Sequence, residues 1–222
     1  MIAIDGPVAS GKTAVGLRLA RELGYRLVDT GMMYRAVTWL ALRREVDVED
    51  ETALTALAEA VRIDLGQPRS DGGPTISVDG VDVTAELRSP DVDRSVSYVS
   101  RVAGVRRAMV ARQRQLAVEG RLIMLGRDIG SVVLPDAPVK IYLDASPAER
   151  ARRRHRELAE AGVDRSEADI LAELEQRDEM DRQRHVSPLR PAPDALVIDT
   201  DALSLEEVIE RVREAAGVPP SS

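Results

Sequence analysis

The chain has 222 residues, with 31 Lys and Arg against 38 Asp and Glu, which gives a net charge of −7. This length fits one domain with insertions, and the acidic balance disfavours a general nucleic-acid-binding role. The absence of Cys excludes disulfides, thiolate catalysis and Cys-based metal sites. The two His residues, His155 and His185, are too few for a His-rich metal site. Because no run approaches about 18 apolar residues and Asp5 interrupts the N-terminal apolar run, we expect a soluble, cytoplasmic protein without a membrane partner.

The N-terminal part of the chain alternates short apolar runs with helical periodicity. The run at 1–5 is typical of a buried strand, and apolar residues spaced by four from Gly11 onward predict a helix. A second strand at 26–29, a helix from Thr30 and a third helix at about 52–61 are expected next.

The middle of the chain changes character. Residues 62–95 contain short alternating runs separated by Gly, Pro and Asp, which predict a small antiparallel insertion. Helical periodicity returns at about 98–119, and the apolar runs at 122–126 and 139–143 are typical of buried strands.

The C-terminal part is mostly charged and helical. Residues 146–186 predict a helical segment broken at Gly162, followed by a strand at 195–198 and a last helix that Ser204 can cap. Strands that alternate with helices in this way indicate an α/β protein with a doubly wound parallel sheet, here of five strands.

A phosphate-binding motif lies between the first strand and the first helix. It satisfies the pattern G-x-x-x-x-G-K-[ST] at every position, in the order Gly6, Pro7, Val8, Ala9, Ser10, Gly11, Lys12 and Thr13. The glycines let backbone N–H groups face phosphate oxygens, Lys12 can reach the outer phosphates, and Thr13 can ligate Mg²⁺. Because Val8 is β-branched and disfavours positive φ, we expect a conventional backbone there.

The remaining sequence narrows the class of nucleotide-binding protein. A GTPase needs an Asn-Lys-x-Asp motif to read its base, and this chain contains no Asn. A motor ATPase or helicase needs more chain than follows the motif. A small-molecule kinase fits the length.

Four further blocks carry a resemblance to a known family. They are DTGMMYR at 29–35, GRDIG at 126–130, PDAPVKIYLDAS at 135–146 and RDEMDR at 177–182. With the phosphate-binding motif and in this order, the chain resembles bacterial cytidylate kinases from residue 2 to about residue 212. The resemblance implies transfer of a phosphoryl group from ATP to CMP or dCMP with Mg²⁺ as cofactor, by a monomer.

The resemblance also implies how the chain is organised. It places a single P-loop kinase domain over 1–222, with helices on both faces of the sheet and a core that comprises 1–61, 96–145 and 187–214. A small NMP-binding insertion would occupy about 62–95, and a helical lid about 146–186.

Site residues are carried over by the same resemblance. The motif residues and Arg150 would bind ATP, and the catalytic cations would be Lys12, Arg153 and Arg154. The residues implied for CMP are Thr30, Arg35, Ser97, Arg106, Arg127, Asp128, Arg177, Asp181 and Arg184. Phosphoryl transfer needs such a concentration of cations, and residues 96–127 hold seven Arg against one Glu.

Each part of CMP has its own implied partners. Arg35, Arg127 and Arg177 would hold the phosphate. Ser97, Arg106 and Asp128 would read cytosine, which offers an amino donor and two acceptors. Asp181 would bond the ribose, and Arg184 another part of CMP.

Helical spacing supports a shared face. Arg177, Asp181 and Arg184 fall at i, i+4 and i+7, whereas Asp178 and Arg182 form an i, i+4 pair on another face. A salt-bridged, solvated helix would show a similar pattern.

The metal ligands follow from the motif and from strand ends. Thr13 and, through water, Asp29 are the candidates for Mg²⁺, with Asp5 as a weaker rival.

Two other interpretations stay open. A kinase for UMP, AMP or a small metabolite would share the phosphate-binding motif and differ at Arg106 and Asp128. A nucleotide-gated RNA-binding or regulatory switch would bind RNA in a salt-dependent manner, and the acidic total charge argues against it.

Overall fold

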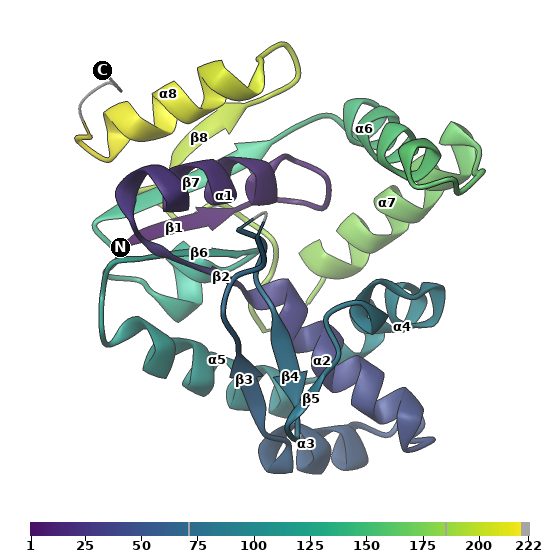
Figure 1. The fold of residues 1–222 in the computed structure, drawn as a ribbon. Helices are drawn as coiled ribbons and strands as arrows, with labels where there is room; N and C mark the ends of the chain where they lie inside the picture. The colour runs from purple at the N-terminus through teal and green to yellow at the C-terminus, as the bar shows by residue number, and fades with distance from the viewer. Residues whose placement is uncertain (71, 185, 219–222) are drawn as a thin grey trace. The chain divides into compact units, whose positions relative to one another are not determined.

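A computed structural model describes residues 1–70, 72–184 and 186–218. His185 lies outside the described residues. The chain packs as two compact units, of which one joins Met1–Tyr25 to the residues from Ile123 onward and the other is Arg26–Leu122. The elements of each unit are shown in Figure 1.

The main sheet has five strands in the order β2-β6-β1-β7-β8. Strand β1 pairs in parallel with β6 and β7, and β7 pairs in parallel with β8. This confirms the predicted α/β fold with a five-stranded parallel sheet. The strands are β1 (Ile2–Asp5), β2 (Arg26–Asp29), β6 (Leu122–Gly126), β7 (Val139–Asp144) and β8 (Leu196–Asp199).

Helices accompany these strands as the alternating pattern predicts. In the first unit they are α1 (Lys12–Leu23), α6 (Pro147–Glu160), α7 (Glu167–Arg182) and α8 (Leu205–Ala215). Helix α1 packs against β1 and against α8, and the two helices lie side by side in Figure 1. The predicted cap of the last helix is confirmed, because Ser204 forms a capping box with Glu207.

The predicted lid segment is a helical hairpin. Ser146 and Ser166 cap α6 and α7 by accepting hydrogen bonds from backbone N–H groups three residues later. The predicted break at Gly162, with φ of +74°, separates the two helices. Buried Ala151, Ile170 and Leu174 form the apolar contact between them, so the hairpin has its own small core.

The second unit surrounds a separate antiparallel sheet. Its strands are β3 (Ile63–Leu65), β4 (Ile76–Val78) and β5 (Val81–Asp82), and its helices are α2 (Thr30–Arg43), α3 (Glu51–Ala60), α4 (Pro90–Arg101) and α5 (Ala103–Ala117), with the short turn η1 (Glu86–Arg88). Helix α2 packs on α4, and α3 on α5. Val37, Leu54 and Met109 are among the residues buried in their common core.

The helical boundaries around residue 100 differ from the prediction. The single helix expected at about 98–119 is two helices, and the first begins at Pro90. Proline is favourable at the first helical position, where Ser89 precedes it and Asp91 and Asp93 lie in the first turn. The break falls at Val102, whose ψ of 121° is extended.

One further element was missed from the sequence. The turn η2 (Ile129–Val133) is a π-helical segment directly after Asp128.

Within the described residues, no helix could span a membrane.

Candidate active site

The phosphate loop, residues 6–13, connects the buried strand β1 to the first turn of α1. Gly6 has φ of +147°, and a Cβ there would lie 2.1 Å from the carbonyl oxygen of Leu143, so no larger residue fits. The expected conventional backbone at Val8 is confirmed, because the positive φ angles fall on Gly6, Ala9 (60°) and Gly11 (92°). The loop therefore follows a backbone path that requires glycine at position 6.

Lys12 folds back over the phosphate loop. Its Nζ donates hydrogen bonds to the carbonyl oxygens of Gly6 (2.8 Å) and Pro7 (2.5 Å) and contacts the hydroxyl of Ser10 (3.4 Å). The ammonium group thus lies against the loop itself, at the N-terminus of α1, where the helix dipole also favours an anion.

The residues predicted to hold Mg²⁺ have separate local roles. Thr13 is an exposed residue in the first turn of α1. Asp29 caps α2 by accepting a hydrogen bond from the N–H of Gly31 (2.9 Å). Among the described residues, no cluster of three or more His, Asp or Glu could hold a metal ion.

Asp5, the weaker metal candidate, anchors η2. Its two carboxylate oxygens accept hydrogen bonds from the N–H groups of Ile129 (2.7 Å) and Gly130 (2.8 Å). Burial raises the pKa of Asp5 from 3.8 to about 6, and these two hydrogen bonds oppose the rise. Asp5 therefore fixes the segment that follows Asp128.

The raised pKa of Asp5 predicts a pH dependence of stability. Between about pH 4 and pH 6 the folded protein keeps a proton that the unfolded chain has lost, so this contribution to stability falls as pH rises and is lost above about pH 6. Between pH 5 and pH 7.5 the free energy of unfolding should fall by about 1 kcal/mol relative to Asp5→Asn. Urea denaturation of both proteins measures this difference, and a difference that does not change with pH would contradict it.

Asp181 gathers two of the predicted CMP-binding arginines. Its carboxylate forms ion pairs with Arg127, which follows β6, and with Arg184, which lies beyond the end of α7. The side chains of Asp181 and Arg184 are 2% and 4% exposed, and that of Arg127 is 22% exposed. A single carboxylate thus orients two guanidinium groups, of which Arg127 is the more accessible.

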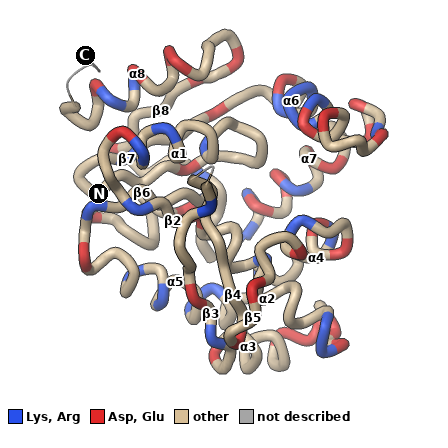
Figure 2. Tube along the Cα trace, viewed as in Figure 1, with Lys and Arg blue, Asp and Glu red and all other residues tan. Residues whose placement is uncertain are grey.

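The predicted lid arginines have different surroundings. Arg153 donates hydrogen bonds to the hydroxyl (3.0 Å) and the carbonyl oxygen (2.6 Å) of Thr200. It also pairs with the carboxylate of Glu149 (3.0 Å). Arg154 is paired with Glu157 (2.9 Å). Figure 2 marks several basic positions along α6.

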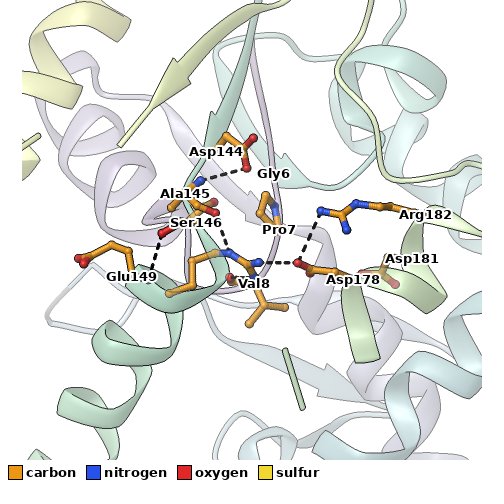
Figure 3. Close-up of polar contacts among 12 residues, drawn as sticks. Gly6, Pro7, Val8, Asp144, Ala145, Ser146, Glu149, Asp178, Asp181 and Arg182 are labelled. Carbon is orange, nitrogen blue, oxygen red and sulfur yellow. Dashed lines mark hydrogen bonds and ion pairs between the residues drawn. The ribbon is translucent and has the colours of Figure 1, made fainter. Parts of the chain in front are cut away.

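Arg150 differs from the other lid arginines because it is buried. Its guanidinium group, 1% exposed, bonds to the carbonyl oxygens of Ala145 and Val8 and to the carboxylate of Asp178. Figure 3 shows Val8 of the phosphate loop and Asp178 of α7 in this cluster.

Of the other predicted residues, Asp128 is buried and Arg177 belongs to α7, both in the first unit, whereas Arg35 and Arg106 lie in the second. Arg35 of α2 pairs with Asp93 of α4 (2.5 Å) and donates to the carbonyl oxygen of Leu87 (2.8 Å). Arg106 is buried, stacks over the ring of Tyr34 at 5.3 Å and donates to the carbonyl oxygen of Ser100 (3.2 Å).

Two more predicted residues are buried in the same unit. Ser97 lies in α4, where its carbonyl oxygen accepts from the hydroxyl of Ser100 (3.3 Å). Thr30 is the first residue of α2. Arg106 and Ser97 are thus both associated with Ser100.

Comparison with known proteins decides the family. The family model described as cytidylate kinase matches residues 2–217. The chain belongs to the cytidylate kinase family. A cytidylate kinase from Geobacillus kaustophilus is 49% identical over 213 residues, which cover 96% of this chain and 94% of that protein.

Two other similarities have a narrower meaning. A bifunctional pantoate ligase/cytidylate kinase from Synechococcus sp. is 46% identical over 96% of this chain, which spans 39% of that protein's length. The solved structure of an uncharacterized protein from Eubacterium ventriosum has a TM-score of 0.52 at 11% identity and covers 96% of this chain and 95% of its own. This last similarity concerns the fold alone.

Several polar partners in this member of the cytidylate kinase family were not anticipated from the sequence. Asp178 was expected to pair with Arg182, and that contact exists at 4.0 Å, but its shorter contact is with Arg150 at 2.5 Å. Thr200, a partner of Arg153, lies 47 residues away along the chain. Both partners join distant segments, so no local spacing indicates them.

Proposed function

We propose that the protein transfers the γ-phosphoryl group of ATP to CMP or dCMP, which gives ADP and CDP or dCDP, and so serves pyrimidine nucleotide metabolism. The observation that carries the proposal is the complete phosphate loop between β1 and α1 in a chain of the cytidylate kinase family. That loop supplies a site for the donor nucleotide, and the family supplies the acceptor.

ATP is proposed to bind along the phosphate loop, residues 6–13. Backbone N–H groups of the loop and the N-terminus of α1 face the phosphates, and Lys12 exchanges its contacts with the Gly6 and Pro7 carbonyl oxygens for phosphate oxygens. The exchange replaces neutral acceptors with charged ones, which form stronger hydrogen bonds to an ammonium group.

CMP is proposed to bind the nine residues that the family resemblance implies. Arg35, Arg127 and Arg177 hold its phosphate, and Ser97, Arg106 and Asp128 read cytosine. Asp181 binds the ribose, and Arg184 and Thr30 contact other parts of the nucleotide. The pairing of Asp181 with both Arg127 and Arg184 supports this assignment, since it orients their guanidinium groups before CMP binds.

Phosphoryl transfer then requires positioning and charge neutralisation more than covalent chemistry. Lys12 stabilises negative charge that spreads over the transferring group, and Arg153 and Arg154 do so from α6. Closure of the helical lid would exclude water, so that transfer to CMP outcompetes hydrolysis.

Mg²⁺ is proposed as the cofactor, held by Thr13 and, through water, by Asp29. When bound it supplies a hard positive charge that neutralises the phosphates of ATP. The exposed position of Thr13 at the end of the phosphate loop supports this assignment. We further propose a monomeric, cytoplasmic enzyme.

The proposal is tested by incubating the purified protein with Mg·ATP and CMP and separating the nucleotides by ion-exchange chromatography. ADP and CDP should appear in equal amounts. ADP without CDP would indicate hydrolysis and contradict the proposed transfer.

Base reading by Asp128 makes a separate prediction. Asp128→Ala should lower kcat/KM for CMP by about 100-fold, because the amino group of cytosine loses its charged acceptor, while KM for ATP changes little. Steady-state kinetics with each substrate varied in turn measures both effects. An equal loss for CMP and ATP would remove the base-reading role from Asp128.

A further inference from the structure

The guanidinium group of Arg150 is buried and donates hydrogen bonds to three protein acceptors. Its Nε donates to the carbonyl oxygen of Ala145 (3.0 Å), one terminal nitrogen to that of Val8 (3.2 Å) and the other to the carboxylate of Asp178 (2.5 Å). All three nitrogens are thus in use, and the side chain is 1% exposed. Arg150 therefore connects the residues just before α6, the phosphate loop and α7, and Figure 3 shows these segments.

The contact with Val8 controls the orientation of a loop peptide. In a trans peptide unit the C=O and N–H bonds point in opposite directions. When Arg150 holds the carbonyl oxygen of Val8 on one side, the N–H of Ala9 must face the other side. Ala9 has φ of 60°, which is unfavourable for a residue with a Cβ, so this loop conformation needs support from its surroundings.

Asp178 keeps the guanidinium group in place. Its carboxylate is 2% exposed and pairs with Arg150, whereas Arg182 is 4.0 Å away. The second oxygen, Oδ1, is buried and has no hydrogen-bond partner within the described part of the chain. A buried ion pair with one unsatisfied oxygen contributes little to stability, because its hydrogen bonds offset only part of the free-energy cost of removing the carboxylate from water.

We propose that Arg150, fixed by Asp178, is a positioning residue that orients the phosphate loop for ATP and does not itself contact the nucleotide. This inference rests on the proposed function, because it concerns ATP binding by the same loop. It replaces the direct ATP contact that the family resemblance implied for Arg150 with an action through the carbonyl group of Val8.

Three variants separate positioning from a purely structural role. Arg150→Met leaves the buried carboxylate of Asp178 without its partner, and Asp178→Leu does the same to the guanidinium group of Arg150. Each single variant should therefore lower the unfolding midpoint by about 10 °C. The double variant removes both charges and should recover most of that loss. It should nevertheless keep KM for ATP raised about tenfold or more, because the Val8 carbonyl remains unsupported.

A conservative variant, Arg150→Lys, tests the inference even if the Arg150→Met and Asp178→Leu variants fail to fold. Arg150→Lys keeps a charge for Asp178, but one ammonium group does not reproduce the three-way fork of a guanidinium group. We expect an unfolding midpoint close to that of the wild type together with a raised KM for ATP and a KM for CMP that changes less than about threefold.

Arg156→Met is the matched control, because Arg156 is an exposed arginine of the same helix. It should leave both KM values and the unfolding midpoint unchanged. Calorimetric titration with Mg·ADP gives a readout that does not depend on turnover. Weaker Mg·ADP binding by Arg150→Lys and by the double variant would support the inference.

Two results would overturn the inference. If the double variant or Arg150→Lys binds Mg·ADP as tightly as the wild type, the pair serves the fold alone and the proposed function is unaffected. If the wild type itself binds no Mg·ADP, the proposed function fails together with the inference. The wild-type titration therefore distinguishes the two failures.

Discussion

Lys12→Met is expected to lower kcat for CMP phosphorylation by about 1,000-fold, since it removes the cation that lies against the phosphate loop. The lost charge acts mainly where negative charge spreads in the transition state, so kcat should fall more than KM for ATP rises. Folding should be retained, because Lys12 is only half-buried and a Met side chain has a similar length. Steady-state kinetics and circular dichroism measure the two properties.

Lys140→Met is the matched control, because Lys12 and Lys140 are the only lysines in the chain. Lys140 pairs with Asp194 (2.7 Å) and lies on β7. Because the side chain of Lys140 is only 8% exposed and also donates to the carbonyl oxygen of Pro135, its replacement should lower stability but leave kcat within about twofold. Unchanged turnover in Lys12→Met would contradict the role given to the phosphate loop.

Asp181→Asn is expected to have the second largest effect. The substitution keeps the shape of the side chain and removes the charge shared by Arg127 and Arg184, one of which is nearly fully buried. Removing one partner of a buried pair costs about 3 kcal/mol of unfolding free energy. The two guanidinium groups also lose their orientation, so kcat/KM for CMP should fall about 100-fold.

The control for Asp181→Asn is Asp136→Asn, which alters an exposed carboxylate in the same unit. It should affect neither denaturation nor kinetics. Denaturant unfolding and CMP kinetics on both variants measure the difference. A stable Asp181→Asn protein with wild-type CMP kinetics would show that this cluster lies outside the acceptor site.

Most of the fold follows from local patterns in the sequence. The parallel strands were predictable because each is a short apolar run between helical segments, as with the fully buried residues of β1. The break between α4 and α5 at Val102 was not predictable, because helical periodicity continues through it on both sides. The π-helical turn after Asp128 depends on the remote carboxylate of Asp5, which accepts two of its N–H groups.

The site was predictable in its motif and less so in its supporting contacts. Gly6, Lys12 and Thr13 are identified by a fixed spacing that phosphate chemistry imposes. The partners of Arg150 are not, since Val8 and Asp178 lie 142 residues before it and 28 residues after it. Such contacts depend on tertiary packing and leave no periodic signal in the chain.

The most direct test of the account is the choice of phosphoryl acceptor. Release of ADP from Mg·ATP by the purified protein should be measured in parallel with CMP, dCMP, UMP and AMP. We predict clear preference for CMP and dCMP, which would support Ser97, Arg106 and Asp128 as the residues that read cytosine. Turnover with none of the four, or preference for UMP or AMP, would contradict the proposed acceptor.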